Sequence, residues 1–169
     1  SNGQTLQIDS GITIQGYVGV VQNWSGNSII NAGTLELTGS GTLGASLASM
    51  AIANAGIFKS SSTTTQTIAG SITGQGAIIQ SGTGALTLSG DNTYSGGTTI
   101  NNGSILNVGN GGTTGSLGSG GVLNNGALRF NRSNTLTVTN SISGAGSVTQ
   151  AGTGTTILTA DNSYAGATA

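Results

Sequence analysis

Residues 70–99 read GSITGQGAIIQSGTGALTLSGDNTYSGGTT, and residues 140–169 repeat them as NSISGAGSVTQAGTGTTILTADNSYAGATA, with 14 identities in 30 positions and no gap. The same offset places Trp24 over Tyr94, Asn54 over Asn124 and Lys59 over Arg129. Self-similarity at a fixed period indicates a repeat architecture. We therefore expect residues 1–169 to form a single segment, an excerpt of a longer chain, with two copies at approximately 22–91 and 92–161.

A shorter spacing lies inside this repeat. Asn-x-Gly elements begin at Asn31, Asn54, Asn101 and Asn124, and the same interval separates the two members of each pair. Three such steps nearly make the longer period, and an interval of roughly 23 residues is typical of one turn of a solenoid. This spacing predicts about seven coils of roughly 23 residues, with Asn31 stacked on Asn54 and Asn101 stacked on Asn124.

Local patterning identifies the kind of solenoid. Apolar residues alternate with polar ones in Leu35-x-Leu37, Leu86-x-Leu88, Leu128-x-Phe130 and Leu136-x-Val138, which indicates strands with one buried face. Gly and Asn recur every five to ten residues and supply sharp corners. The sequence thus predicts an all-β fold, a right-handed parallel β-helix, with a β-bulge where the register of Ile105–Val108 is ambiguous.

Composition excludes several classes of function. The chain has Gly 32, Pro 0, Cys 0 and His 0, with three basic and four acidic side chains and a net charge of −1. General acid–base catalysis needs titratable groups, thiolate or imidazole metal sites need Cys or His, and nucleic-acid binding needs a basic surface. We therefore predict a non-enzymatic protein with no catalytic, cofactor-binding or metal-binding residues, no cofactor, and no nucleic-acid partner.

Two motifs have a chemical interpretation that the sequence does not favour. Gly39-Ser-Gly41-Thr-Leu-Gly44 matches a dinucleotide-binding pattern, but a Gly-rich chain produces such a match by chance, and no acidic residue follows at the required distance. Asp91 and Asp161 are too far apart for a glycosidase pair if three coils separate them. Each precedes Asn, so we expect the Asp and the Asn of both motifs to cap turns by bonding their own backbone.

Trp24, Tyr94 and Tyr164 occupy one position of the repeat and leave two interpretations open. An aligned aromatic row could stack on sugars, or each ring could close over the glycines of a corner. Arg129 and Arg132 are too few to form a nucleic-acid patch. The glycosylation patterns at Asn23, Asn102 and Asn131 are no more numerous than chance predicts.

Residues 74–103, GQGAIIQSGTGALTLSGDNTYSGGTTINNG, resemble the passenger-associated transport repeat, also called the autotransporter-associated β-strand repeat, of Gram-negative surface proteins. The likeness is strong over 70–169, weaker over 23–69 and barely visible before residue 20. Departures are also present. A Lys common in the family is Gln80 here and Gln150 in the second copy, where Thr156 and Ala160 replace Leu86 and Gly90.

The resemblance implies a stalk or adhesin module of an exported passenger, outside the cell or on its outer surface, whose repeats assist folding during secretion. It also implies a C-terminal membrane barrel in the same precursor and a host-cell or glycan surface as a partner. A self-associating fibre subunit that stacks end to end is the alternative, and a polysaccharide-cleaving β-helix is a remote one.

Overall fold

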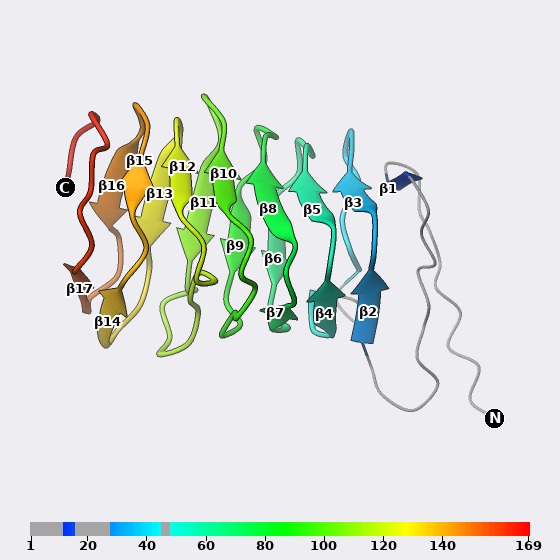
Figure 1. Cartoon of the computed structure of the whole chain (residues 1–169), viewed down its shortest axis with the longest axis horizontal. Helices are drawn as coiled ribbons and strands as arrows, with labels where there is room; N and C mark the ends of the chain where they lie inside the picture. The colour runs from blue at the N-terminus through cyan, green and yellow to red at the C-terminus, as the bar shows by residue number, and fades with distance from the viewer. Residues whose placement is uncertain (1–11, 16–27, 45–47) are drawn as a thin grey trace.

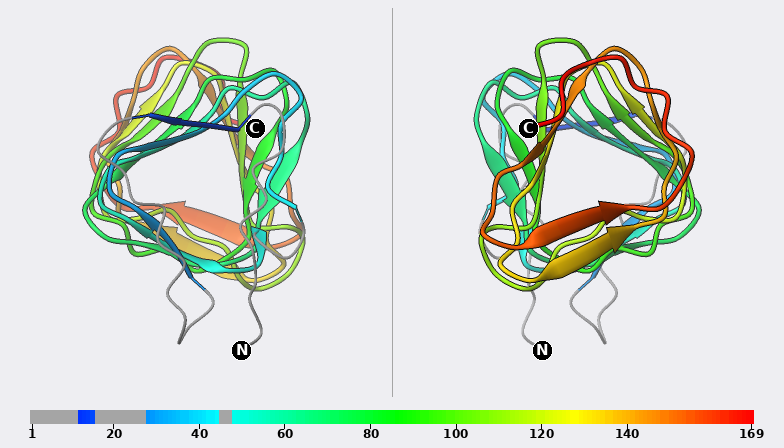
Figure 2. Two further views of the ribbon diagram at one scale, coloured as in Figure 1. Left: turned by 90° about the vertical axis from the view of Figure 1, so that its right-hand side faces the viewer. Right: turned by 90° about the vertical axis from the view of Figure 1, so that its left-hand side faces the viewer.

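The computed structural model describes residues 12–15, 28–44 and 48–169, and every named element within these ranges is a β-strand. The chain winds in a right-handed sense for about six turns and advances steadily from one end to the other (Figure 1). Seen along its axis, the coil is triangular, with three flat faces (Figure 2). The predicted right-handed parallel β-helix is confirmed, with about six turns where about seven coils were expected.

Each face is a sheet built from strands of successive coils. The first face contains β1 (Ile12–Gln15), β3 (Thr34–Leu37), β5 (Ile57–Ser60), β8 (Ala77–Gln80), β10 (Thr98–Ile100), β12 (Val122–Asn124) and β15 (Ile142–Ser143). The second contains β6 (Gln66–Ile68), β9 (Leu86–Leu88), β11 (Ile105–Val108), β13 (Ala127–Phe130) and β16 (Ser147–Gln150). The third comprises β2 (Ser28–Asn31), β4 (Ala51–Asn54) and β7 (Ile72–Thr73), followed farther along by β14 (Thr135–Val138) and β17 (Thr155–Leu158).

Alternation of side chains explains why these short segments form strands. In β4, β8 and β11 every second residue is buried, and the intervening residue is partly exposed. The inward residues are mostly Ile, Leu and Val, joined by Phe58, Phe130 and Tyr94. Stacking them in columns removes apolar surface from water on all three sides of a narrow core.

Coil length varies along the axis, and the common coil is shorter than expected. The first described coil does have the expected length, because Thr34 pairs with Ile57 in the next layer. The following layers are 20 residues apart, as in the pairings of Phe58 with Ile78 and of Ile78 with Thr98. A longer coil of 24 residues then separates Thr98 from Val122. Loop insertions therefore lengthen particular turns.

The bulge expected near residues 105–108 is absent. All four residues of β11 pair in continuous parallel register with β13, from Ile105↔Ala127 to Val108↔Phe130. The extra residues of this coil lie outside the strands, between β11 and β12, where the loop at 109–115 is found. Loops absorb insertions at lower cost than a ladder does, because a bulge leaves ladder groups unpaired.

β1 departs from the parallel pattern. It pairs antiparallel with β3, with Ile12 opposite Leu37 and Gln15 opposite Thr34. An edge strand can receive a partner in either direction, since both arrangements satisfy its free backbone groups. β1 thus occupies the first edge of the first face without adding a coil of the solenoid.

Candidate functional site

The surfaces between successive coils are the candidate functional element of this chain. Backbone hydrogen bonds connect one coil to the next at the corners as well as within the sheets. Examples are Ala55 N donating to Asn31 O (2.8 Å), Ser95 N donating to Gly74 O (2.8 Å) and Ala127 N donating to Ser104 O (2.9 Å). Each coil therefore presents an edge that orders the following coil.

A buried Asn reinforces one corner of each of two successive coils. Asn31 and Asn54 are fully buried, and Asn31 Nδ2 donates to Asn54 Oδ1 at 2.7 Å and to Ile57 O at 2.9 Å. Asn54 Nδ2 in turn donates to Ala77 O at 3.1 Å. The predicted stack of Asn31 on Asn54 is confirmed, and its amides tie three layers together.

The predicted stack of Asn101 on Asn124 is wrong. Asn124 pairs in register with Ile100 and donates to Ser147 O at 2.9 Å, whereas Asn101 is exposed. The cause is the coil between Thr98 and Val122, which is one residue longer than the Asn-x-Gly spacing. A shift of one residue moves a side chain from the core to the solvent face.

The two copies of the long repeat build the same local devices. Gln80 Nε2 donates to the carbonyls of Gly82 and Gly84 at 3.1 and 2.7 Å. In the second copy Gln150 Nε2 donates to Gly152 and Gly154 at 3.0 and 3.1 Å. A Gln followed by two alternate glycines thus forms a closed turn. The sequence analysis did not predict this function of the amide, although the Gln-x-Gly-x-Gly pattern occurs in both copies.

The Asp-Asn-[Thr/Ser]-Tyr motif forms a second repeated device. Asn92 Oδ1 accepts from Ile72 N at 2.7 Å, and Asn162 Oδ1 accepts from Ile142 N at 2.8 Å, each one coil back. Both amides also donate to a carbonyl two residues earlier in their own turn, at 2.9 Å for Asn92 and 2.7 Å for Asn162. The turn-capping function belongs to the Asn of the motif.

The acids of this motif behave differently from the prediction. Asp91 Oδ1 accepts from Gly115 N at 3.0 Å, so Asp91 bonds the next coil, 24 residues away. The prediction that it bonds its own turn is wrong. Asp161 is exposed. Their neighbours Asn92 and Asn162 cap strands on the third and first faces respectively, so the two acids belong to different corners of the triangle.

The aromatic position also changes its surroundings between copies. Tyr94 is fully buried, and its hydroxyl bonds Thr98 Oγ1 at 2.7 Å. Burial raises the pKa of the Tyr94 phenol, an effect that the Thr98 hydrogen bond opposes. Tyr164 bonds Thr168 at the same distance but is only partly buried. The closed corner therefore fits Tyr94, while Trp24 lies outside the described residues.

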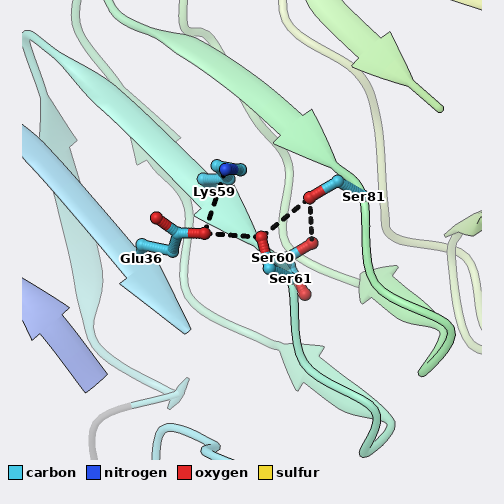
Figure 3. Close-up of polar contacts among 5 residues, drawn as sticks. All are labelled: Glu36, Lys59, Ser60, Ser61 and Ser81. Carbon is cyan, nitrogen blue, oxygen red and sulfur yellow. Dashed lines mark hydrogen bonds and ion pairs between the residues drawn. The ribbon is translucent and has the colours of Figure 1, made fainter. Parts of the chain in front are cut away.

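A small charged network lies on the first face (Figure 3). Glu36 Oε1 is 3.0 Å from Lys59 Nζ and accepts from Ser61 Oγ at 2.6 Å. The Ser61 hydroxyl also lies 2.8 Å from Ser81 Oγ, so the network spans three coils. The Ser61 hydrogen bond lowers the pKa of Glu36 most, burial opposes it, and Lys59 lowers it further.

The two arginines have different surroundings. Arg132 holds the loop at 109–115, since Nη1 donates to Gly115 O at 2.7 Å and Nη2 donates to Thr113 O. Arg129 is an exposed residue of β13, beside Asn107 and Thr149 in register. Lys59, its counterpart in the first copy, lies on the first face.

The remaining chemical motifs fall in turns. Gly39 has φ +58° and Gly41 N donates to Thr38 O at 2.8 Å, so the Gly-rich segment turns sharply after β3.

In the part of the chain that the structure describes, no three His, Cys, Asp or Glu side chains gather as metal ligands. Over the same residues, no helix is long and apolar enough to cross a membrane.

The long repeat does not return the chain to the same face. Three layers above Phe58, through Ile78 and Thr98, the first face reaches Val122. The counterpart of Phe58 in the second copy is Leu128, which lies on the second face in β13. Equivalent residues of the two copies are thus one face apart, yet they make equivalent local bonds.

Comparison with known proteins finds one family whose model matches two segments of the chain. The model of the passenger-associated-transport-repeat family matches residues 78–108 and 148–169. The first segment contains Gln80 and Asn92, and the second contains Gln150 and Asn162. No curated protein and no solved structure matches the chain.

Proposed function

We propose that this chain, which carries two passenger-associated transport repeats, is a structural β-helical module of an exported bacterial surface protein, serving as a passenger stalk or adhesin. One observation carries the proposal: both repeats place an Asn whose side chain bonds the coil before it. Asn92 and Asn162 both accept a backbone N–H from one coil back, at 2.7 and 2.8 Å. A side chain that bonds the coil already formed suits a chain that folds progressively.

The geometry supports assistance to folding during secretion. Each completed coil offers a full row of donors and acceptors, so the next coil can be ordered as it emerges. The chain has no Cys, and charged residues make up 4% of it. An unfolded chain of this composition carries no disulfide and few charges through a pore.

A non-enzymatic function and a site outside the cell follow from the same proposal. The charged groups of the described residues are held in structural contacts or exposed singly, as in the Glu36–Lys59 pair and the Arg132 loop clamp. The repeat family implies export to the surface and a barrel in the same precursor. A host-cell or glycan surface is the partner we propose for the outward faces.

A secretion assay tests the proposal. The chain is placed between a secretion signal and an outer-membrane barrel, and the amount on the cell surface is measured by external protease and antibody labelling. The double variant Asn92→Ala with Asn162→Ala should reach the surface in a smaller amount, because both repeats lose inter-coil bonds. The control Asn101→Ala changes an exposed side chain and should be delivered normally. Equal delivery of the double variant would contradict assistance by the repeats.

The fibre alternative has a separate readout. End-to-end stacking needs free edges on all three faces, and β1 already occupies one edge of the first face by pairing antiparallel with β3. We therefore expect the purified chain to remain free of concentration-dependent fibres in electron micrographs. Regular fibres would favour the alternative.

A further inference from the structure

The chain contains four Asn–Gly pairs, at residues 2–3, 102–103, 110–111 and 125–126. Such a pair can rearrange without an enzyme. The backbone nitrogen of Gly attacks the Asn side-chain carbon Cγ, an N–Cγ bond forms, the Cγ–Nδ2 bond breaks, and ammonia leaves with the amide proton. Water then opens the cyclic imide to aspartate or isoaspartate. Gly favours this attack because it has no Cβ to shield its nitrogen.

The three described pairs differ in whether the attacking Gly nitrogen donates a hydrogen bond. Gly111 N donates to Asn131 O in the next coil at 2.8 Å. Gly126 N donates to Asn124 Oδ1 at 3.2 Å, and the neighbouring Asn125 Oδ1 accepts from Ala145 N at 3.1 Å. Attack at either position requires these bonds to open first.

The third pair is unrestrained. Ser104 N donates to Asn101 O at 3.1 Å and closes a four-residue turn around Asn102 and Gly103. Gly103 has φ +77°, as at the third position of a type II turn, where the N–H forms no hydrogen bond within the turn. Asn102 and Gly103 are both exposed, and the structure gives no hydrogen bond to the Asn102 amide or to Gly103 N.

We infer that, among the three pairs that the structure describes, Asn102 is the site of spontaneous conversion to aspartate and isoaspartate in the folded protein, and that the hydrogen bonds of Gly111 N and Gly126 N protect Asn110 and Asn125. The turn at 101–104 lies outside the strands, so the added backbone atom of isoaspartate leaves every ladder intact. Conversion changes the net charge of the chain from −1 to −2. The new carboxylate forms on the wall of a shallow trough of about 420 Å³ that Arg129 also lines.

Peptide mapping by mass spectrometry tests this inference. The folded chain is kept at mildly basic pH and body temperature, and the amide-to-acid mass change and isoaspartate labelling by a methyltransferase are followed at each pair. Asn102 should convert at least about tenfold faster than Asn110 or Asn125, because at those two pairs the hydrogen bond of the attacking nitrogen must first break. The matched variant Asn102→Gln should remain unmodified in the same peptide, since its longer side chain forms the larger imide far more slowly.

The same chain unfolded in guanidinium supplies the reference. There all three pairs should convert at similar rates, because the protection belongs to the fold. Conversion of Asn110 or Asn125 as fast as Asn102 in the folded chain would overturn the inference. Failure of Asn102 to convert in the folded chain, while it converts in the unfolded one, would overturn it equally.

Discussion

Asn31 and Asn54 show how single amides set the spacing between layers. Each is fully buried, and the Asn54 side chain both accepts from Asn31 and donates to the backbone of the following coil. Unpaired amide nitrogens in the core would be costly, so the side chains favour the stacking distance at which both Nδ2 groups donate.

Asn54→Ala should lower the free energy of unfolding by about 1–3 kcal/mol, because it leaves Ala77 O and one donor position of Asn31 without a partner. Urea unfolding followed by circular dichroism measures the loss. The control is Asn101→Ala, an exposed Asn-x-Gly residue from the same sequence pattern. A loss of similar size in both variants would show that the stacked amide has no special contribution.

Glu36 gives the fold a weak dependence on pH. Its pKa is lowered in the folded state, chiefly by the Ser61 hydroxyl, so ionised Glu36 stabilises the fold above its unfolded pKa of about 4.5. That contribution is lost as the pH falls through the lower folded value.

Glu36→Gln should therefore reduce stability slightly at neutral pH, by less than about 1 kcal/mol since Lys59 is partly exposed. The difference between the variant and the original chain should shrink as the pH falls below 4.5. Urea unfolding across this range measures it, with Asp161→Asn as the control at an exposed acid. A difference that stays constant with pH would exclude the charge as its cause.

At the scale of elements, glycines determine how closely the corners stack. A Cβ at Gly76 would lie 2.2 Å from Gly56 O and 2.6 Å from Asn54 Nδ2, although the backbone conformation at Gly76 is one that other residues adopt. Gly is required here because there is no room for a Cβ between the coils, and not because the backbone angle is unusual.

Gly76→Ala should separate two coils at this corner and lower the free energy of unfolding by about 3 kcal/mol. Gly112→Ala is the matched control, because nothing lies within 4 Å of its added Cβ. Thermal unfolding of both variants checks the prediction. Equal melting temperatures would show that the corner has room to relax.

The elements also show what the sequence could predict. Alternation correctly predicted strands such as β3 and β13, because a strand with one buried side alternates apolar and polar residues. The length of each coil could not be predicted from the residue pattern in the same way. The spacing of Asn31 and Asn54 recurs at Asn101 and Asn124, but the coil there is one residue longer, because loop residues add length without changing the strand pattern.

The candidate site was predicted less well for a related reason. The sequence correctly predicted that Asn92 and Asn162 bond their own turns, but it assigned the same role to Asp91 and Asp161 and did not predict the shared bonds of the two amides to the preceding coil. The partners of these amides are backbone groups one coil away, and backbone groups carry no residue identity that a sequence could reveal.

At the scale of the whole molecule, the layers should act as exchangeable units. Deleting residues 78–97 removes one complete coil and places Thr98 where Ile78 stood, stacked on Phe58. This variant should still fold, with a smaller urea m-value because less surface becomes exposed on unfolding.

Deleting residues 78–87 is the matched control, since it removes half a coil and turns the following strands toward the wrong faces. It should lose protease resistance and strand signal in circular dichroism. A folded half-coil variant, or an unfolded whole-coil variant, would contradict the layer model.

The displacement of equivalent residues by one face has a consequence for how such a chain can lengthen. Phe58 and Leu128 occupy the same position of a repeat that is not a whole number of turns, and each lies in a strand. Gene duplication therefore need not copy complete turns. Equivalent positions of successive copies would follow a spiral around the solenoid, and each face of the solenoid would display a different part of the repeat.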